Sequence, residues 1–368
     1  MAMIKMKTQR LLEFVKSIID EEDKMLINYI DEIKNLLISK GLWVETLTIL
    51  PNSKNGGQSL CFFIRDKNNK PLYIAKYFDY LKDLGNVTNM YDICDCETVD
   101  QYLDMLSDQQ IPYDIDNINE IVYYLKRCFS RYIEVAEKTT NLFPKVHCFE
   151  ENIKIKNSFY GLLIEEAIDG ITLQEKMNNI IMDGNNNIEL AVKCMSEVGK
   201  AIDKLFKNGY VHRDLSPDNI MISNNDNRMI IIDPGTIKII NRDTTNFGYM
   251  FGKWQYASPE QYHGNAVSAD FSSDLYSLGI ISFQIVTGTN LITDYYQKNQ
   301  NDPHNLICRD LDRNIENKFF DYCNEDDEKN IIIYSIIKKL LQVDKKLRFS
   351  NTQSFMDAIG IVKEEKND

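Results

Sequence analysis

Two short segments hold residue types that can transfer a phosphoryl group. The first, HRDLSPDN at His212–Asn219, contains Asp214, and the second, IIDPG at Ile231–Gly235, contains Asp233. Phosphoryl transfer needs positioned phosphates, one or two Mg²⁺ ions and a carboxylate near the attacking hydroxyl. Because Asp233 follows a β-branched run, we expect it at a strand end, where it can reach a metal ion that bridges two phosphates.

The sequence from about residue 44 to 355 resembles the eukaryotic-like Ser/Thr protein kinase family, as a divergent member of prokaryotic or viral type. By that resemblance Asp214 is the base that faces the substrate hydroxyl, and His212 braces its loop. Asn219 and Asp233 would bind Mg²⁺. The resemblance implies ATP and Mg²⁺ as cofactors and a protein substrate, with autophosphorylation expected.

Two later segments resemble elements that occur in protein kinases and not in small-molecule kinases. GKWQYASPEQY at Gly252–Tyr262 is similar to the end of a kinase activation segment. By resemblance Glu260 pairs with Arg348, and such Arg–carboxylate pairs can be bidentate. Asp274, in SSDLYSLGI, would brace the catalytic loop.

The nucleotide-binding residues are expected mainly in the first half of the chain. By resemblance Lys76, in YIAK, contacts the α- and β-phosphates, although a strand-end lysine is more often a solvated edge residue. Its partner is expected to be Glu134, with Glu137 one helical turn later as the fallback. Glu165 falls at the position that the family calls the gatekeeper, beside the hinge.

Adenine would bond to backbone groups near Glu166–Ile168 in that hinge. The phosphate loop is atypical, because SKNGGQS at Ser53–Ser59 lacks the GxGxxG spacing. Gly56 and Gly57 can let backbone amides approach phosphate. They are equally consistent with a plain hairpin turn.

Three departures from the family pattern stand out. Ser216 occupies the place of the usual catalytic-loop lysine, and Lys253 occupies the place of a threonine. We hypothesise that Lys253 supplies the missing cation near the γ-phosphate; the alternative is a solvent-facing Lys253. Pro234 replaces the Phe of the family's DFG motif, which removes a backbone donor.

The activation segment also offers hydroxyls that could be phosphorylated. Thr244, Thr245 and Tyr249 lie between Asp233 and Glu260. A phosphate on one of them could pair with Arg213 and order the segment. We predict this site without choosing among the three.

The elements that must position these residues predict an α+β, bilobal, protein-kinase-like fold. We assign a helical extension to residues 1–43, a β-rich N-lobe to 44–168 with an insertion about 79–116, a helical C-lobe to 169–360 and a polar tail to 361–368. Strands are expected at Val44–Leu50, Leu60–Arg65 and Leu72–Phe78, joined by turn-type sequences. The apolar stripe Leu26, Ile30, Ile33 and Leu37 predicts a helix packed on its own domain. The alternative is a dimer or partner helix.

Composition limits the partners. The 368 residues carry a formal net charge of −13, which disfavours nucleic acid as a partner. No run is long and apolar enough to span a bilayer, and charged residues interrupt the apolar N-terminal run, against a signal peptide. The 8 cysteines are scattered, as in reduced cytosolic proteins. We expect a cytoplasmic protein, or one delivered into a host cytosol, without a membrane or nucleic-acid partner.

Two alternatives to an active protein kinase stay open. Ser216 mildly favours a small-molecule kinase of related fold, which lacks the catalytic-loop lysine. The odd glycine loop, Pro234 and Glu165 suggest a nucleotide-binding pseudokinase or scaffold. Asp214 and Asp233 argue for the active enzyme, since a degraded pseudokinase is expected to lose a catalytic carboxylate.

Overall fold

The structure, a computed structural model, describes residues 21–51, 59–79, 132–139, 141–155, 158–183, 188–233, 238–239, 252–264, 268–298 and 302–364. The chain divides into unit 1 (Met1–Lys126 and Val146–Ala167) and unit 2 (Arg127–Lys145 and Ile168–Asp368). Several predicted features lie outside the described residues. They are Gly56, Gly57, Pro234, Thr244, Thr245, Tyr249 and nearly all of the expected insertion.

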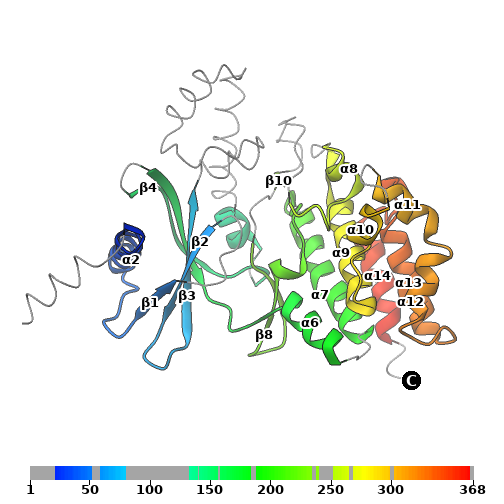
Figure 1. The fold of residues 1–368 in the computed structure, drawn as a ribbon, viewed down its shortest axis with the longest axis horizontal. Coiled ribbons are helices and arrows are strands. Elements are labelled where there is room, and N and C mark those ends of the chain that lie inside the picture. The colour runs from blue at the N-terminus through cyan, green and yellow to red at the C-terminus, as the bar shows by residue number, and fades with distance from the viewer. Residues whose placement is uncertain are drawn as a thin grey trace, which may run out of the picture. The chain divides into compact units, whose positions relative to one another are not determined.

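A five-stranded antiparallel sheet forms the body of unit 1, in the order β1-β2-β3-β5-β4 (Figure 1). Its strands are β1 (Thr48–Pro51), β2 (Ser59–Arg65), β3 (Pro71–Asp79), β4 (Val146–Ile155) and β5 (Ser158–Glu166). The predicted meander of the first three strands is confirmed, although the first strand begins four residues later than expected.

The turn between β2 and β3 follows from its sequence, DKNNKP. The Asp66 carboxylate accepts backbone hydrogen bonds from Asn68 (2.8 Å) and Lys70 (2.9 Å). Asn69 takes the left-handed conformation at φ 64°, which asparagine tolerates better than most residues. This tight connection fixes the register of β3.

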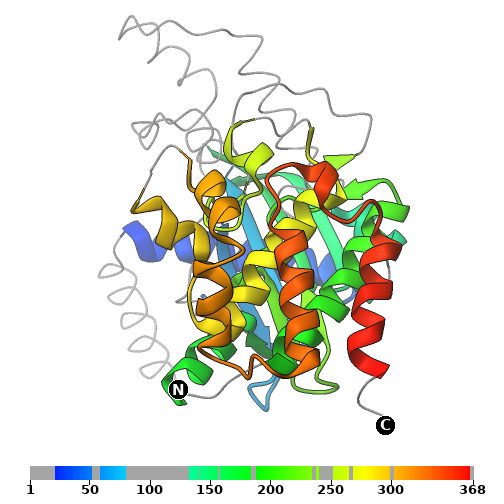
Figure 2. The same cartoon turned by 90° about the vertical axis from the view of Figure 1, so that its right-hand side faces the viewer.

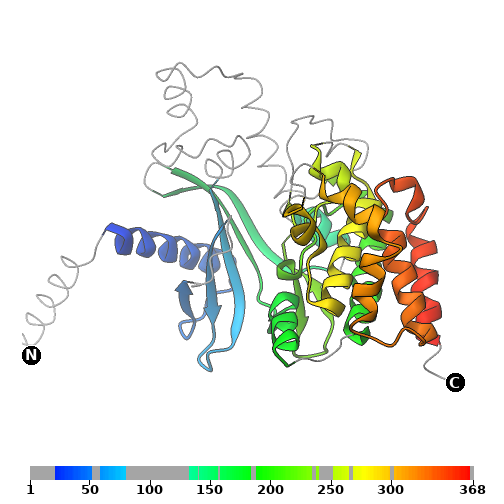
Figure 3. The same cartoon turned by 45° about the vertical axis from the view of Figure 1, so that its right-hand side comes forward.

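The helix α2 (Glu21–Ser39) covers one face of this sheet, as Figure 3 shows. Its residues Ile33 and Leu37 are fully buried in a core with Phe62, on β2, and Tyr77, on β3. The Tyr77 hydroxyl donates a hydrogen bond to the backbone carbonyl of Tyr29 (2.9 Å). The predicted apolar stripe is therefore used within unit 1, which confirms a helix packed on its own domain.

Unit 2 is mainly helical (Figures 1 and 2). Its named helices are α6 (Leu173–Asp183), α7 (Ile188–Lys207), α8 (Pro259–Tyr262), α9 (Phe271–Thr287), α10 (Leu291–Tyr296), α11 (Pro303–Asp310), α12 (Asn314–Phe320), α13 (Glu328–Leu340) and α14 (Thr352–Glu364). The central α9 is buried along nearly its whole length and contacts α7 and α13. It begins after the N-cap Asp270 and ends at Gly288 in the left-handed conformation (φ 68°).

Short strands in unit 2 frame the polar segments of interest. The strand β6 (Gly170–Thr172) pairs with β8 (Ile220–Ser223), which forms a hairpin with β9 (Met229–Ile231). The strand β7 (Tyr210–Val211) pairs with β10 (Lys238–Ile239). Two 3-10 turns, η2 (Pro217–Asn219) and η4 (Lys345–Leu347), complete the unit. Within the described ranges, no helix has both the length and the apolar character needed to cross a bilayer.

Candidate active site

The segment His212–Asn219, here called the HRD loop, joins β7 to β8 and fixes the Asp214 carboxylate from two sides. Asp214 Oδ1 accepts a hydrogen bond from the backbone N–H of Lys253 (2.9 Å). Asp214 Oδ2 accepts one from Nδ2 of Asn219 (3.1 Å). Asp214 is thus held in one orientation by groups far apart in the sequence.

Asn219 is oriented in turn by the same loop. Its Nδ2 also donates to the backbone carbonyl of Asp214 (3.0 Å), so both bonds use the amide nitrogen. Its side-chain oxygen accepts no hydrogen bond from the described residues, which leaves it available as a ligand. Oxygen ligands of carboxylates and carboxamides are those that Mg²⁺ prefers. Asn219 and Asp233 stay the residues predicted to bind the metal.

A buried carboxylate from α9 holds the beginning of the HRD loop. Asp274 accepts hydrogen bonds from the backbone N–H groups of His212 and Arg213, both 2.8 Å. Burial raises the pKa of Asp274 to about 7, against the lowering effect of these two bonds. Arg213 takes a left-handed backbone conformation at φ 70°. A non-glycine residue adopts this conformation only where the surroundings enforce it, as the two hydrogen bonds to Asp274 do here. The predicted bracing role of Asp274 is confirmed.

His212 is fully buried, and its ring stacks parallel to Phe143 at a centroid distance of 6.3 Å. Burial lowers the pKa of His212 to about 4, so the ring is neutral at physiological pH. The negative charge of Asp233 opposes this shift. The sequence prediction of a structural histidine agrees with this placement.

The charge of Asp233 also acts on Asp214. Burial, followed by the negative charge of Asp233, raises the pKa of Asp214 to about 6. A neighbouring negative charge disfavours the ionised form of a carboxylate, so Asp233 acts in the same direction as burial. A raised pKa makes Asp214 a better proton acceptor near neutral pH.

The predicted Glu260–Arg348 pair is present and bidentate. Arg348 Nη1 and Nη2 each lie 3.0 Å from a different carboxylate oxygen of Glu260. Burial by itself would raise the pKa of Glu260, but the bonds and charge of Arg348 hold it below the usual value. Ser273, at the start of α9, donates a further hydrogen bond to Glu260 (2.6 Å). The pair therefore joins α8, α9 and the segment before α14.

Gly252 and Lys253 pass directly over the HRD loop. Gly252 has φ 90°, and an added Cβ would lie 2.6 Å from the Arg213 carbonyl oxygen. Only glycine permits this close approach. Lys253 Nζ lies 2.8 Å from the Asp218 carboxylate, with both side chains partly exposed. The lysine thus reaches the HRD loop at Asp218, while the Ser216 hydroxyl is buried with no hydrogen-bond partner among the described residues.

In unit 1, Lys76 forms an ion pair that sequence reasoning missed. Its Nζ lies 2.7 Å from Oε1 of Glu165, and the two side chains are 10% and 1% exposed. Glu134, the predicted partner, lies in the 132–138 helix of unit 2, where it pairs with Lys138. The available signal was an acidic residue inside the apolar strand sequence GLLIEE, since a carboxylate is rarely buried without a partner.

Adenine was predicted to bond to backbone groups near Glu166–Ile168, a segment that begins at the last residue of β5 and continues beyond it. Glu166 is the last residue of β5 and has an exposed side chain, and Ile168 is half-buried. The N–H of Ala167, between them, donates to the Leu72 carbonyl (3.0 Å). This amide is therefore occupied by β3 within unit 1.

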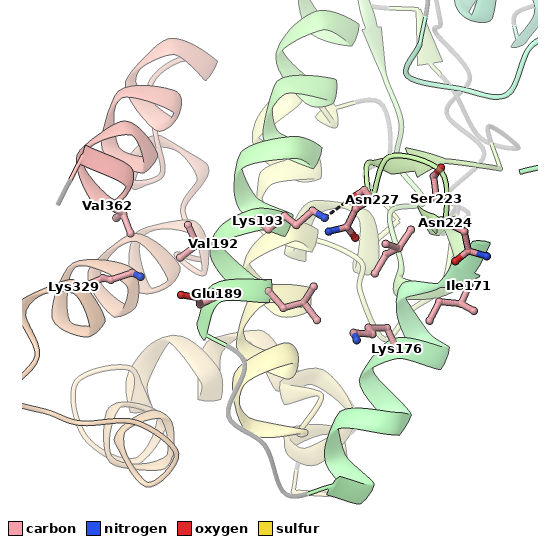
Figure 4. A pocket seen from close by; sticks show the side chains of 12 residues that line it. Ile171, Lys176, Glu189, Val192, Lys193, Ser223, Asn224, Asn227, Lys329 and Val362 are labelled. Atoms are coloured by element: carbon pink, nitrogen blue, oxygen red, sulfur yellow. Dashed lines mark hydrogen bonds between the residues drawn. The ribbon is translucent and has the colours of Figure 1, made fainter. Parts of the chain in front are cut away.

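A separate hollow of about 690 Å³ lies in unit 2, away from the residues described above (Figure 4). It is lined by parts of α6, α7, the β8–β9 hairpin and α13, and lysines 176, 193 and 329 reach it. In Figure 4 Lys193 bonds the Asn227 carbonyl across one wall. None of the predicted site residues contributes to this hollow.

Known proteins resemble both the sequence and the fold. The probable serine/threonine-protein kinase PknB of Lactococcus lactis is 33% identical over 127 residues, covering 34% of this chain and 19% of that protein. The serine/threonine-protein kinase PknB of Mycobacterium leprae is 32% identical over 179 residues, covering 43% and 28%. The chain thus spans less than a third of the length of these curated relatives.

Among solved structures, the PknI kinase domain of Mycobacterium tuberculosis matches with a TM-score of 0.52 and 14% identity, over 88% of this chain and 98% of that domain. At this identity the likeness shows the fold, which is the predicted α+β kinase fold. Residues 126–358, more than half of the chain, match the family model of the protein kinase domain. With the bidentate Glu260–Arg348 pair and the Asp274 anchor in place, the chain belongs to the protein kinase family.

Proposed function

We propose that this chain is an ATP- and Mg²⁺-dependent protein kinase that transfers the γ-phosphoryl group to Ser or Thr hydroxyls. The observation that carries the proposal is the Asp214 carboxylate, which is fixed by Lys253 N–H and Asn219 with Asp233 close enough to raise its pKa. The serine/threonine kinase relatives support the choice of acceptor.

In the proposed reaction Asp214 orients the substrate hydroxyl and accepts its proton. The hydroxyl oxygen forms a bond to the γ-phosphorus, the bond from that phosphorus to the bridging oxygen breaks, and ADP leaves with the electron pair. Because its pKa is about 6, Asp214 is ionised at neutral pH and still basic enough to take the proton.

Asn219 and Asp233 would hold the metal through their side-chain oxygens. When bound, Mg²⁺ supplies the positive charge that neutralises the phosphate oxygens during transfer. The buried Ser216 hydroxyl, which has no protein partner among the described residues, is available to donate a hydrogen bond to a phosphate. Lys253 would add a cation beside it, as the sequence suggested.

The remaining nucleotide-binding assignments in this proposal rest on the family resemblance. Lys76 would bind the α- and β-phosphates, and backbone groups at Gly56, Gly57, Glu166 and Ile168 would contact the nucleotide. Glu134 stays a predicted carboxylate partner of Lys76. A partner or dimer contact through the N-terminal helices and a cytoplasmic location also stay predictions.

The test is transfer from γ-labelled ATP with Mg²⁺ to the chain itself and to a mixed Ser/Thr peptide library. Asp214→Asn should reduce incorporation about 100- to 10,000-fold, the range that a general base contributes. Mass spectrometry then identifies the modified residue type.

The matched control is Asp226→Asn, which makes the same change in the exposed β8–β9 turn. It should leave transfer unchanged. Equal transfer by the Asp214→Asn variant and the unmodified chain would overturn the proposal, and modification of tyrosine alone would overturn the Ser/Thr assignment.

One observation favours a second candidate, a nucleotide-binding module without transfer. The ammonium of Lys76 is already paired with Glu165, and a pair of this kind could withhold the lysine from phosphates. Calorimetric binding of Mg·ATP by a chain that transfers no label to any acceptor would support this reading.

A further inference from the structure

The Lys76–Glu165 pair arises from the geometry of the unit 1 sheet. In the β3–β5 register Lys76 lies opposite Leu163, and Ile74 lies opposite Glu165. Residues two apart on a strand share a face, so Lys76 and Glu165 are diagonal neighbours on one face. Long side chains can span such a diagonal. The pair therefore requires only that β3 and β5 are in register.

This face is the one opposite α2. The alternating neighbours Ala75, Tyr77, Leu162 and Ile164 belong to the core that α2 covers. Because strand side chains alternate, Lys76, Leu163 and Glu165 point to the other face. Glu165 is nevertheless 1% exposed, so its carboxylate is removed from water and must be compensated by a positive partner. Lys76 supplies that charge at 2.7 Å.

We propose that Glu165 is the positioning residue of Lys76, holding its ammonium in the orientation that binds ATP phosphates. This inference rests on the proposed kinase function. The carboxylate that positions Lys76 then lies on strand β5, whereas the resemblance to the family placed this carboxylate on a helix, at Glu134. Both members of the pair belong to unit 1, whereas Glu134 belongs to unit 2.

A strand-borne partner has a mechanical consequence. The two strands are joined by a continuous ladder from Tyr73–Glu166 to Asp79–Tyr160, so the distance between their side chains is set by backbone hydrogen bonds. A helix can move relative to a sheet, but neighbouring strands cannot separate without breaking this ladder. The Lys76 ammonium then stays beside Glu165, and its position does not depend on movement of the helix that carries Glu134.

The test compares Glu165→Gln with Glu134→Gln and with Glu150→Gln. Glu150 is the matched control, because it pairs with Lys40 at 3.5 Å in the same unit but is 45% exposed. The first measurement is the labelling rate of Lys76 by an amine-reactive ester at one fixed pH without nucleotide, followed by peptide mass spectrometry. Loss of the neighbouring negative charge favours the neutral, reactive amine. Glu165→Gln should raise labelling of Lys76 at least threefold, and the other two variants should not.

The second measurement is steady-state kinetics with varied ATP. Glu165→Gln should raise the KM for ATP about tenfold, and Glu165→Asp, which keeps the charge on a shorter arm, should recover part of that loss. A purely structural role would lower the melting temperature without this change in KM. Faster transfer by Glu165→Gln would overturn the proposal, because it would mean that Glu165 withholds the lysine.

A double variant keeps the test valid if Glu165→Gln does not fold. Removing one partner leaves a buried unpaired charge, while replacing both with apolar residues is often tolerated. Lys76→Met/Glu165→Met should therefore fold, and Glu165→Asp then carries the labelling and kinetic comparisons. Increased labelling of Lys76 in Glu134→Gln together with unchanged labelling in Glu165→Gln would also overturn the proposal, and so would a KM for ATP in Glu165→Asp equal to that of the unmodified chain.

The labelling measurement needs no catalysis, so the two proposals fail separately. If the unmodified chain transfers no phosphate, the proposed function is wrong. The labelling rate still decides whether Glu165 controls the reactivity of the Lys76 amine.

Discussion

The HRD loop of unit 2 and the Lys76–Glu165 pair of unit 1 hold charged side chains in different ways. At the loop, Asp214 accepts a hydrogen bond from the backbone N–H of Lys253, and Asp274 of α9 accepts hydrogen bonds from those of His212 and Arg213. In unit 1, two side chains on neighbouring strands bond each other directly. Backbone N–H groups are present whatever the sequence, so a loop held by them depends only on the few carboxylates that accept their hydrogen bonds. A side-chain pair needs only a partner of opposite charge, and this partner can come from another element.

Asp214, Asn219, Asp274, Glu260 and Arg348 match the family pattern by resemblance, and each makes a specific contact at the loop or beside it. The partner of Lys76 need only be a carboxylate within reach. We expect substitutions around the loop to be less tolerated than a relocation of the partner of Lys76.

The largest expected loss of stability comes from Arg348→Met. It leaves the Glu260 carboxylate partly buried without its bidentate partner and should lower the free energy of unfolding by about 3–5 kcal/mol. Urea denaturation of the whole chain measures the change in the free energy of unfolding. Lys338→Met, which removes the partly exposed pair between Lys338 on α13 and Asp312, is the control and should change stability by about 1 kcal/mol or less. Equal effects would show that Glu260–Arg348 does not join the segments.

Asp274→Asn tests how far the HRD loop depends on its buried acceptor. The amide presents a donor to one of the two backbone N–H groups and leaves that group unsatisfied, at a cost of about 1–3 kcal/mol. Because Arg213 then loses the bond that enforces its left-handed conformation, transfer should fall about tenfold or more with the stability loss. Urea titration and labelled-ATP assays measure both. Full activity in a destabilised variant would mean that the conformation of the loop is set elsewhere.

Lys253→Ala separates the two roles of that residue. Its backbone N–H, which holds Asp214, remains, while the side chain on Asp218 is lost. If the ammonium stabilises the transferring phosphate, turnover should fall at least tenfold, about 1.4 kcal/mol, with little change in the KM for ATP. Lys346→Ala, on the exposed η4 turn, is the control. Unchanged turnover would show that Lys253 only faces solvent.

The smallest effect concerns pH. Since Asp214 must be ionised to accept a proton, and its pKa is raised to about 6, activity should fall as pH drops through that value. An ordinary aspartate would keep its activity down to about pH 4. The charge of Lys253 lowers the pKa of Asp214, so Lys253→Ala should move the acid limb upward by a few tenths of a unit. ATP titrates identically in both proteins, so the difference between their profiles reports Asp214. Coincident profiles would contradict this coupling.

The sequence predicted most of the fold and of the HRD loop. Strand and turn signals located the meander, and the resemblance to the kinase family implied the Glu260–Arg348 and Asp274 contacts, which depend on fixed residue types. It did not predict the Lys76–Glu165 pair. That pair depends on the register of β3 against β5, across more than eighty residues of intervening chain, and local patterns carry no information about such pairing.

The packing of α2 also bears on where this kinase domain can be shortened. The resemblance described from the sequence begins near residue 44, and the family model matches from residue 126, so both would suggest a fragment without α2. Such a fragment would expose the apolar side of the sheet, including Phe62, Ile64 and Tyr77, to water. Exposed aromatic and aliphatic strand surfaces promote association between molecules. A fragment that keeps this face of the sheet covered must therefore include α2, which shields these apolar side chains from association between molecules.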